Sequence, residues 1–305
     1  MQIAILGLEK MGRMLTEKLL TAGHEVVVWN RTRESLDAIR IEDAEYVVNQ
    51  KLILAYTIDE LRNVLRKPRI VWCMMPSGEP TETVIQQLNG IIEAGDVVVN
   101  GGNANYKDTQ RHFEEFEKRG IKFLGIGIAG GIHGSENGYS LTVGGNEDAY
   151  QFLVPVLDSL SEPNGIHGYF GTGGAGHFVK MVHNGIEYGM MQSIAEGLAI
   201  LKKSDYQISL EDSVTAWQEG GIISSFLLDM VLDALSKDPE FSQFDGVIGS
   251  SLSGKWAVEQ AKTTNISVPV IEQSLAFRER SQYDKAIQET FIAKALQAML
   301  KEWKG

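Results

Sequence analysis

Five polar residues that could perform acid–base chemistry lie within nine positions of the chain. They are Lys180, His183, Asn184, Glu187 and Tyr188. At 3.6 residues per turn, these positions share one face of a helix. A lysine can act as a base and a glutamate as an acid, while the other three side chains can hydrogen-bond a substrate. A solvated face of ion pairs would have the same spacing, but the glycines before and within the run favour a catalytic helix.

The composition narrows the class of protein. The chain has 305 residues, of which 43% are hydrophobic and 22% charged, and this suits an ordinary soluble protein of about two domains. Its single cysteine, Cys73, lies in an apolar run, so we expect a buried thiol and a reducing, cytoplasmic setting. The start of the chain resembles a strand and not a signal peptide, and no run approaches the roughly 20 apolar residues of a membrane span. A net charge of −12 argues against nucleic acid as a partner.

Short apolar runs and stretches of helical periodicity alternate through the first half of the chain. The runs lie at 2–6, 25–29, 69–75, 96–99, 121–126 and 139–143. This alternation predicts an α/β fold, a Rossmann-type doubly wound, mostly parallel sheet. From about residue 146 we expect helices, at 146–160, 177–202, 210–218, 222–236, 254–262 and within 268–302. We therefore predict a dinucleotide-binding domain over 1–175 and an all-helical domain for substrate binding and dimerisation over 176–305.

A glycine-containing turn joins the first expected strand to a helix. It reads Gly7-Leu8-Glu9-Lys10-Met11-Gly12. In the dinucleotide fingerprint, such glycines allow a tight turn and bring the pyrophosphate close to the helix N-terminus. Glu9 replaces the middle glycine, and its carboxylate would repel the phosphates unless it turns outward.

The residues after the second expected strand indicate which nicotinamide cofactor is used. Trp29 is followed by Asn30, Arg31 and Thr32. NAD-specific sites place an acidic residue near this point to hold the ribose hydroxyls, whereas an amide and an arginine suit the 2′-phosphate of NADP. We expect NADP to be the cofactor, with NAD as the second choice.

Four segments, the first of which contains the five polar residues above, support a resemblance to one family. The run 174–189 resembles the catalytic helix of the 6-phosphogluconate dehydrogenases, in their short-chain branch, and 71–82 resembles the family's cofactor-lining segment, with Met75 and Pro76. Residues 100–104 resemble its Asp-Gly-Gly-Asn-Ser loop, in which Asn103 matches the amide that contacts substrate and nicotinamide.

The segment 127–131 is similar to the family's Val-Ser-Gly-Gly loop. Here Ala129 stands at the serine position, so one substrate hydrogen bond is lost. The amides of Gly130 and Gly131 can still hold a carboxylate without obstruction by side chains.

The resemblance implies oxidative decarboxylation of 6-phosphogluconate, or a closely related 6-substituted gluconate, with reduction of NADP. Lys180 would take the hydroxyl proton during hydride transfer and then polarise the new carbonyl, and Glu187 would protonate the enediol carbon. His183 and Asn184 would orient the substrate hydroxyls, and Tyr188 its distal end. No metal is expected, because the carbonyl and ammonium supply the electron sink. The resemblance also implies a homodimer or homotetramer.

The chain departs from the family near the group that would hold the substrate's distal end. Ser251 and Ser253 fall where long-chain enzymes carry a lysine and a threonine, and 301–305 lacks the family's Phe-Gly-Gly-His type ending. Arg278 and Arg280 are candidate replacement anion anchors. The group at substrate C6 therefore stays open between phosphate, sulfonate and none. A β-hydroxyacid dehydrogenase that stops after hydride transfer, a 6-sulfogluconate-type enzyme and a non-catalytic NADP-binding regulatory protein are the alternatives.

Overall fold

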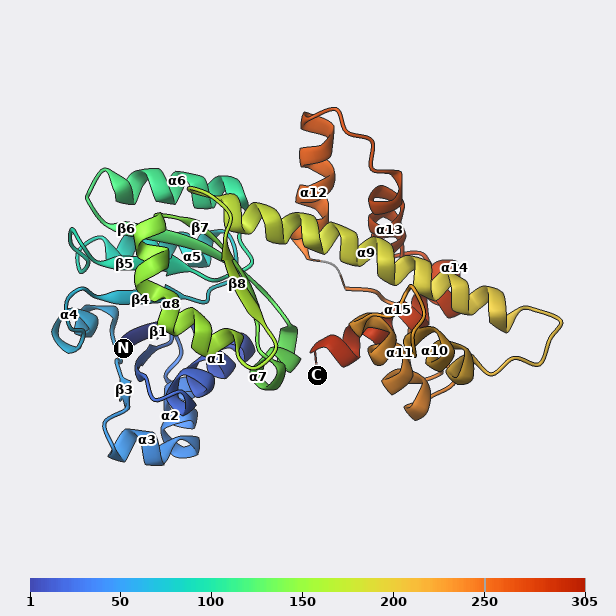
Figure 1. Cartoon of the computed structure of the whole chain (residues 1–305), viewed down its shortest axis with the longest axis horizontal. Coiled ribbons are helices and arrows are strands. Elements are labelled where there is room, and N and C mark those ends of the chain that lie inside the picture. Colours follow the sequence, from blue (N-terminus) through green and yellow to red (C-terminus); the bar gives the residue numbers. More distant parts are fainter. Residues whose placement is uncertain (250, 305) are drawn as a thin grey trace. The chain divides into compact units, whose positions relative to one another are not determined.

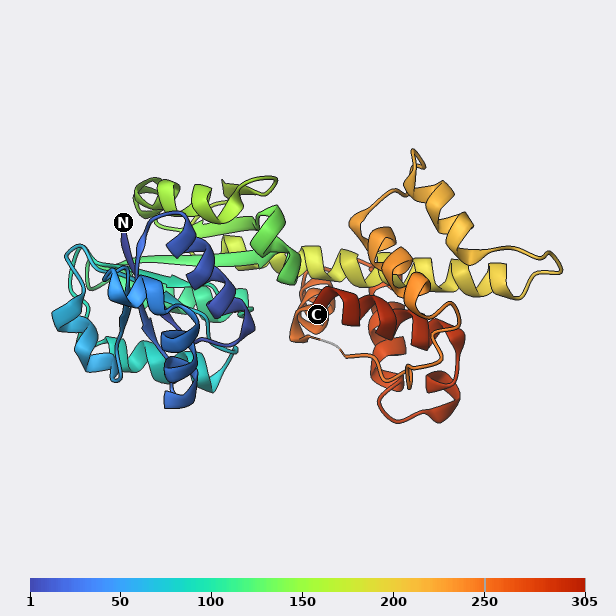
Figure 2. The same ribbon diagram turned by 90° about the horizontal axis from the view of Figure 1, so that it is seen from below.

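The computed structural model describes residues 1–249 and 251–304. The chain forms two compact units, Met1–Lys180 and Met181–Gly305. One helix, α9 (Ala175–Lys202), begins in the first unit and ends in the second, and its ribbon is continuous in Figures 1 and 2. The domain boundary after residue 175 stays a prediction, since the two units divide five residues later, within this helix. Among the described residues, no helix combines the length and hydropathy that crossing a membrane requires.

The first unit is built on an eight-stranded sheet with the order β3-β2-β1-β4-β5-β6-β7-β8 (Figure 1). Strands β1 to β6 are parallel, β7 is antiparallel to β6, and β8 is parallel to β7. The order reverses direction between β1 and β4, as in doubly wound nucleotide-binding sheets. The predicted α/β fold is confirmed. The strands are β1 (Gln2–Leu6), β2 (Glu25–Trp29), β3 (Leu52–Leu54), β4 (Ile70–Cys73), β5 (Val97–Asn100), β6 (Lys122–Ala129), β7 (Ser140–Gly145) and β8 (Ile166–Tyr169).

Helices cover both faces of this sheet, because alternate residues of its strands are buried on opposite sides. Ile3 and Ile5 belong to one hydrophobic core with α1 and α8, whereas Ala4 and Leu6 belong to a second core with α5 and α6. The helices of this unit are α1 (Lys10–Thr21), α2 (Arg33–Glu42), α3 (Ala44–Val48), α4 (Leu61–Val64), α5 (Glu79–Leu88), α6 (Tyr106–Glu117), α7 (Gly134–Asn137) and α8 (Glu147–Ser161).

All six apolar runs predicted as strands are strands, and two further strands escaped prediction. Strand β3 has three residues, too few to show a period. Strand β8 pairs with β7 at the edge of the sheet, and its sequence, Ile-His-Gly-Tyr, lacks a continuous apolar run because it is only partly buried. The expectation of helix alone after residue 146 is therefore wrong at β8.

The second unit is helical, as predicted. Leu228 and Val231 of α11 pack with Leu296 and Met299 of α15 and with Met191 of α9 in one core. Helix α11 begins four residues later than expected, and the side chain of Gln218 accepts the backbone N–H of Ser225 in the connection before it. The helices are α10 (Leu210–Gln218), α11 (Phe226–Lys237), α12 (Leu252–Thr263), α13 (Pro269–Arg280), α14 (Lys285–Gln288) and α15 (Phe291–Lys304).

Candidate active site

The turn between β1 and α1 requires both of its glycines. Gly7 has φ +103°, and a Cβ there would lie 2.6 Å from the carbonyl oxygen of Met74. A Cβ on Gly12 would lie 1.9 Å from the carbonyl oxygen of Gly7, so α1 begins in direct contact with the turn. This places a helix N-terminus at the carboxyl end of β1, beside the reversal in strand order, where a pyrophosphate is favourably held. Within the turn, Leu8 is buried, Met11 is half-buried, and Glu9 and Lys10 are exposed.

The residues after β2 are tied to this turn. The side-chain oxygen of Asn30 accepts the N–H of Leu8 at 3.0 Å, and its amide nitrogen donates to Oγ1 of Thr32 at 2.9 Å. Arg31 is exposed and, within the part of the chain that the structure describes, makes no hydrogen bond or ion pair. A pocket at this edge is lined by Trp29, Asn30, Arg31, Tyr56, Thr57, Ile58, Asp59 and Gln87.

The loops after β4 and β5 are in close contact. A Cβ on Gly101 would lie 2.1 Å from the indole nitrogen of Trp72, and one on Gly102 would lie 2.3 Å from the carbonyl oxygen of Met75. Oγ1 of Thr81 donates to the carbonyl of Pro76 at 2.7 Å, which fixes this loop to α5. The two glycines therefore bring the loop that carries Asn103 against the loop that carries Met75 and Pro76.

The loop after β6 exposes backbone amides. Gly130 and Gly131 have φ +125° and +53°, a left-handed conformation that strains other residues. Among the described residues, their N–H groups donate to no partner. Ala129, which ends β6, is half-buried. Two such N–H groups can donate to an anionic group, and their role in holding the substrate carboxylate stays a prediction.

Small residues allow the start of α9 to lie directly on β6 and β7. A Cβ on Gly176 would lie 2.4 Å from the carbonyl oxygens of Gly125 and Thr142, and one on Gly127 would lie 2.3 Å from Cβ of Lys180. Oγ1 of Thr142 donates to the carbonyl of Gly176 at 2.9 Å. Lys180 is buried, with 8% of its surface exposed. The packing therefore holds Lys180 beside the strand that leads into the Gly130–Gly131 loop.

The other predicted residues of α9 lie in the second unit. Nδ1 of His183 is 3.2 Å from Oδ1 of Asn184 and 3.8 Å from a carboxylate oxygen of Glu187. Asn184 is buried, while Glu187 is half-buried. The hydroxyl of Tyr188 accepts the backbone N–H of Ser251 at 2.7 Å. The helix predicted over 177–202 is confirmed, and it brings His183, Asn184 and Glu187 together.

Arg278 lies against this group of side chains. Its guanidinium carbon is 3.8 Å from the centre of the Tyr188 ring, and it donates to the carbonyl of Gly249 at 3.1 Å. Burial lowers the pKa of Arg278, while Tyr188 and Glu187 act in the opposite direction. Its Nε–H is buried and has no partner among the described residues. Arg280, in contrast, is exposed and pairs with Asp284 at 3.2 Å.

Ser251 and Ser253 lie at the start of α12. Ser251 is the N-cap residue, and its Oγ is 3.2 Å from the hydroxyl of Tyr188, whereas Ser253 is fully buried. A Cβ on Gly254 would lie 2.6 Å from the Tyr188 ring, so this glycine lets α12 approach the tyrosine closely. The role of Gly254 follows from this packing, and no spacing rule in the sequence indicates it.

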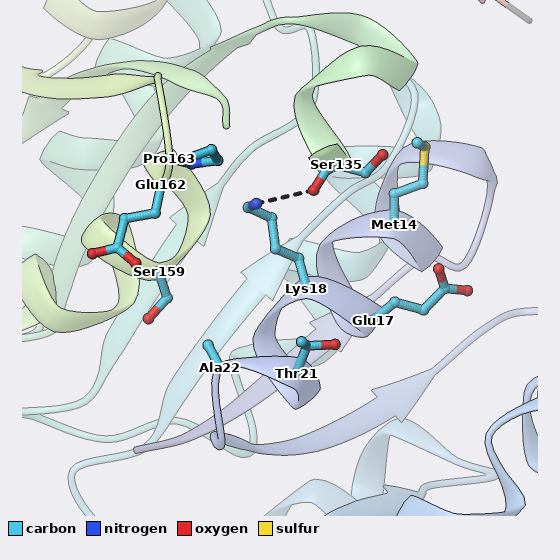
Figure 3. Close-up of a pocket in the computed structure, with 9 residues that line it drawn as sticks. All are labelled: Met14, Glu17, Lys18, Thr21, Ala22, Ser135, Ser159, Glu162 and Pro163. Carbon is cyan, nitrogen blue, oxygen red and sulfur yellow. Dashed lines mark hydrogen bonds between the residues drawn. The ribbon is translucent and has the colours of Figure 1, made fainter. Parts of the chain in front are cut away.

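A separate pocket of the first unit contains none of the predicted site residues (Figure 3). Its centre is the ammonium of Lys18, which donates to the carbonyl of Ser135 at 3.0 Å. Burial lowers the pKa of Lys18, while Glu162 raises it. Among the described residues, no cluster of three or more His, Cys, Asp and Glu side chains could hold a metal ion.

The doubly wound sheet, the glycine turn and the helix that carries Lys180 define a nicotinamide-dependent oxidoreductase with a helical second domain. Residues 2–172 match the NAD-binding domain of 6-phosphogluconate dehydrogenase, and residues 176–302 match the C-terminal domain of the same enzyme. The chain belongs to the 6-phosphogluconate dehydrogenase family, and the predicted resemblance is confirmed.

Individual relatives agree with this assignment. The chain is 34% identical over 305 residues to YqeC of Bacillus subtilis, provisionally named a 6-phosphogluconate dehydrogenase, covering 100% of this chain and 98% of that protein. It is 34% identical over 285 residues to the NAD(+)-dependent, decarboxylating 6-phosphogluconate dehydrogenase of Haloferax volcanii, covering 93% of this chain and 92% of that enzyme. The 6-phosphogluconate dehydrogenase of Plasmodium falciparum, solved with NADP+ and with 6-phosphogluconate, superposes with a TM-score of 0.83 at 29% identity. That alignment covers 94% of this chain and 63% of the Plasmodium chain.

Proposed function

We propose that the protein oxidises and decarboxylates 6-phosphogluconate, or a closely related 6-substituted gluconate, to a ketopentose derivative and carbon dioxide. The observation that carries the proposal is the position of Lys180, buried against β6 on the helix that also bears Asn184 and Glu187. A base at this point can act on a hydroxyl, and an acid farther along the helix can act on the carbon next to it.

In the first step, Lys180 takes the proton of the C3 hydroxyl while the C3 hydrogen leaves with its electron pair. NADP, when bound, supplies the hydride acceptor. The product is a β-keto acid, and the ammonium of Lys180 donates a hydrogen bond to its new carbonyl oxygen. The C1–C2 bond then breaks, carbon dioxide leaves, and the electron pair moves to the carbonyl oxygen, which Lys180 protonates. Glu187 finally protonates C2 of the enediol, and the enol proton returns to Lys180.

The remaining predicted residues bind the substrate. The amides of Gly130 and Gly131 hold its carboxylate, which explains why both N–H groups lack partners within the described part of the chain. Asn103 contacts substrate and nicotinamide, while His183 and Asn184 orient the hydroxyls. Tyr188 and the unpartnered Nε–H of Arg278 hold an anionic group at C6.

The cofactor is NADP, with NAD as the weaker alternative. The turn 7–12 holds the pyrophosphate, and Met75 and Pro76 line the site. Asn30 hydrogen-bonds both to the turn and to Thr32, so Arg31 is the member of this group whose charge is available to the 2′-phosphate.

The protein is a homodimer or larger homo-oligomer of the cytoplasm. Val182, Ile186 and Met190 of α9 recur every four residues and are all exposed, which gives a helix in the second unit an apolar stripe. A two-fold related copy would cover this stripe with the same stripe, and homodimer interfaces are apolar in this way.

One experiment tests the activity. The purified protein is supplied with NADP and with 6-phosphogluconate, 6-sulfogluconate or gluconate, and NADPH and carbon dioxide are measured together. We expect one carbon dioxide for each NADPH with a substrate that carries an anion at C6. NADPH without carbon dioxide would assign the protein to the simple β-hydroxyacid dehydrogenases, and no turnover with any of the three would refute the proposal.

A further inference from the structure

His177 is a buried histidine on the first turn of α9 that the reaction above does not use. It lies three residues before Lys180, and so on the same side of the helix, and 2% of its surface is exposed. Gly125 of β6 makes room for its ring, because a Cβ at that position would lie 3.1 Å from Nδ1 of His177 and 2.3 Å from Cγ2 of Thr109. A glycine in a central strand thus opens a space that a histidine and a threonine fill.

Nδ1 of His177 lies 2.7 Å from Oγ1 of Thr109, on α6. The same oxygen is 3.1 Å from the carbonyl of Asn105, the residue that caps α6. Asn105 comes two positions after Asn103, so these contacts lead from α9 to the end of the loop that carries the predicted nicotinamide contact. The ring of His177 therefore connects the helix of Lys180 with the base of the Asn103 loop.

Two more contacts join the same elements. The side-chain oxygen of Gln110 accepts the N–H of Gly174 at 3.1 Å, immediately before α9. The rings of Tyr106 and Phe178 meet edge to face with their centres 5.0 Å apart. These two contacts hold the two helices together, and the His177–Thr109 contact adds a side-chain hydrogen bond within the first turn of α9, three residues before Lys180.

The environment keeps the imidazole uncharged. Burial lowers the pKa of His177 to about 4, although the carbonyls of Ile126 and Gly102 act in the opposite direction. A neutral ring cannot repel a protonated Lys180 nearby, and its hydrogen-bonding pattern does not change across the neutral range.

We propose that His177 is a positioning residue, which through Thr109 locks the first turn of α9, and with it Lys180, to the loop that carries Asn103. The inference rests on the proposed function, because the alignment of Lys180 with Asn103 matters only if both residues contact the substrate. A base that is displaced by about 1 Å from its substrate can lose about 10²-fold in rate.

The test compares variants that keep or remove the single contact. Thr109→Val removes the hydroxyl but keeps the shape, Thr109→Ser keeps the hydroxyl, and His177→Asn and His177→Gln place an amide nitrogen near the position of either ring nitrogen. His167→Asn is the matched control, because His167 is a largely buried histidine of the edge strand β8 that contacts Asp158 and Tyr150. For each variant we would measure kcat, KM for NADP, the isotope effect with C3-deuterated substrate, and hydrogen exchange of residues 174–182.

We expect Thr109→Val to lower kcat by about 10- to 100-fold, by the rate cost of misplacing a base, with KM for NADP little changed. Its isotope effect should rise because hydride transfer becomes the slow step, and residues 174–182 should exchange faster. Thr109→Ser should restore the wild-type values. The two His177 amide variants should differ from each other in kcat. Equal losses in Thr109→Val and Thr109→Ser, or unchanged exchange in Thr109→Val, would overturn the inference. If Thr109→Val does not fold, the difference in kcat between His177→Asn and His177→Gln tests the inference. Equal activity of these two variants would overturn the inference.

Absence of wild-type turnover would refute the proposed function alone. Hydrogen exchange would then still test whether the His177–Thr109 contact holds α9 to the Asn103 loop, because this measurement requires no substrate. Faster exchange in Thr109→Val but not in Thr109→Ser would support the connection between α9 and the Asn103 loop, and equal exchange would refute it.

Discussion

The side-chain oxygen of Asn30 accepts the backbone N–H of Leu8 at 3.0 Å and thereby ties the loop after β2 to the turn after β1. Two loops expected to contact opposite ends of the cofactor's adenosine diphosphate are thus held by one amide. Asn30→Ala should weaken NADPH and NADH binding to the same extent, by the roughly 0.5–1.5 kcal/mol of a typical hydrogen bond. Fluorescence titration with both nucleotides measures this. Weaker binding of NADPH alone would show that Asn30 contacts the 2′-phosphate itself.

Arg31 should discriminate between the two cofactors. Its side chain is exposed beside the pocket that Trp29 and Tyr56 line. Arg31→Ala should cost roughly 1.5–3 kcal/mol of NADPH binding, the range of a hydrogen bond to a charged group, and little of NADH binding. Arg40→Ala is the control, since Arg40 is an exposed arginine of α2 that pairs with Asp37. An equal loss of both cofactors in Arg31→Ala would contradict the assignment.

Much of the fold and part of the site could be predicted from the sequence. Strands such as β1 and β4 are buried on both faces, and their continuous apolar runs identify them, whereas β8 is an edge strand with no such run. The helix of Lys180 follows from spacing, because neighbours on a helix face are three or four residues apart. The contacts of Asn30 with Leu8 and of His177 with Thr109 join residues 22 and 68 positions apart, and only the folded chain brings such partners together.

The buried ion pair between Arg69 and Asp96 should dominate the polar contribution to stability at the amino ends of β4 and β5. Asp96 is 2% exposed, lies 3.1 Å from the Arg69 guanidinium, and accepts the backbone N–H groups of Arg69 and Glu93. Asp96→Ala should reduce the free energy of unfolding by about 3–5 kcal/mol, since the buried guanidinium then keeps only a 3.9 Å contact with the exposed carboxylate of Glu93 and a hydrogen bond to the carbonyl of Arg62. Urea unfolding at neutral pH measures this. Asp37→Ala is the control, because Asp37 forms exposed ion pairs with Arg33 and Arg40 that do not involve Arg69, and its loss should have little effect.

Acidification should destabilise the fold partly through His177. Its pKa falls from the ordinary value of 6.5 to about 4 on burial. Between these two values the unfolded chain binds a proton that the folded chain does not, so the free energy of unfolding falls as the pH drops through this window and is fully retained above it. Urea unfolding at several pH values should give a shallower loss for His177→Leu than for the wild type. Parallel curves for the two proteins would show that His177 does not contribute.

The apolar stripe of α9 should determine the oligomeric state. Ile186 lies at the centre of this stripe, and 53% of its surface is exposed. Ile186→Asp should convert the homo-oligomer to a monomer, because a buried interface does not tolerate an unpaired carboxylate. Light scattering at micromolar concentration measures this, with Ile41→Asp on α2 as an exposed control. A wild-type protein that is monomeric and fully active would contradict the prediction of a homo-oligomer.

Lys180 and Glu187 should fail in different ways, because one acts in both chemical steps and the other acts only after carbon dioxide has left. Lys180→Met should abolish hydride transfer, since the base and the donor to the new carbonyl are lost together. Glu187→Gln should slow steady-state turnover by roughly 10²- to 10⁴-fold, the usual contribution of a positioned acid. It should still form NADPH in a single-turnover burst, because hydride transfer precedes the blocked step.

Stopped-flow absorbance of NADPH, with carbon dioxide measured in parallel, distinguishes these outcomes. Position matters as much as identity, so Glu187→Asp, which shortens the side chain by one methylene and leaves the stripe at Ile186 intact, should also turn over more slowly than the wild type. A normal burst in Lys180→Met, or unaffected turnover in Glu187→Gln, would move the acid–base chemistry to other residues.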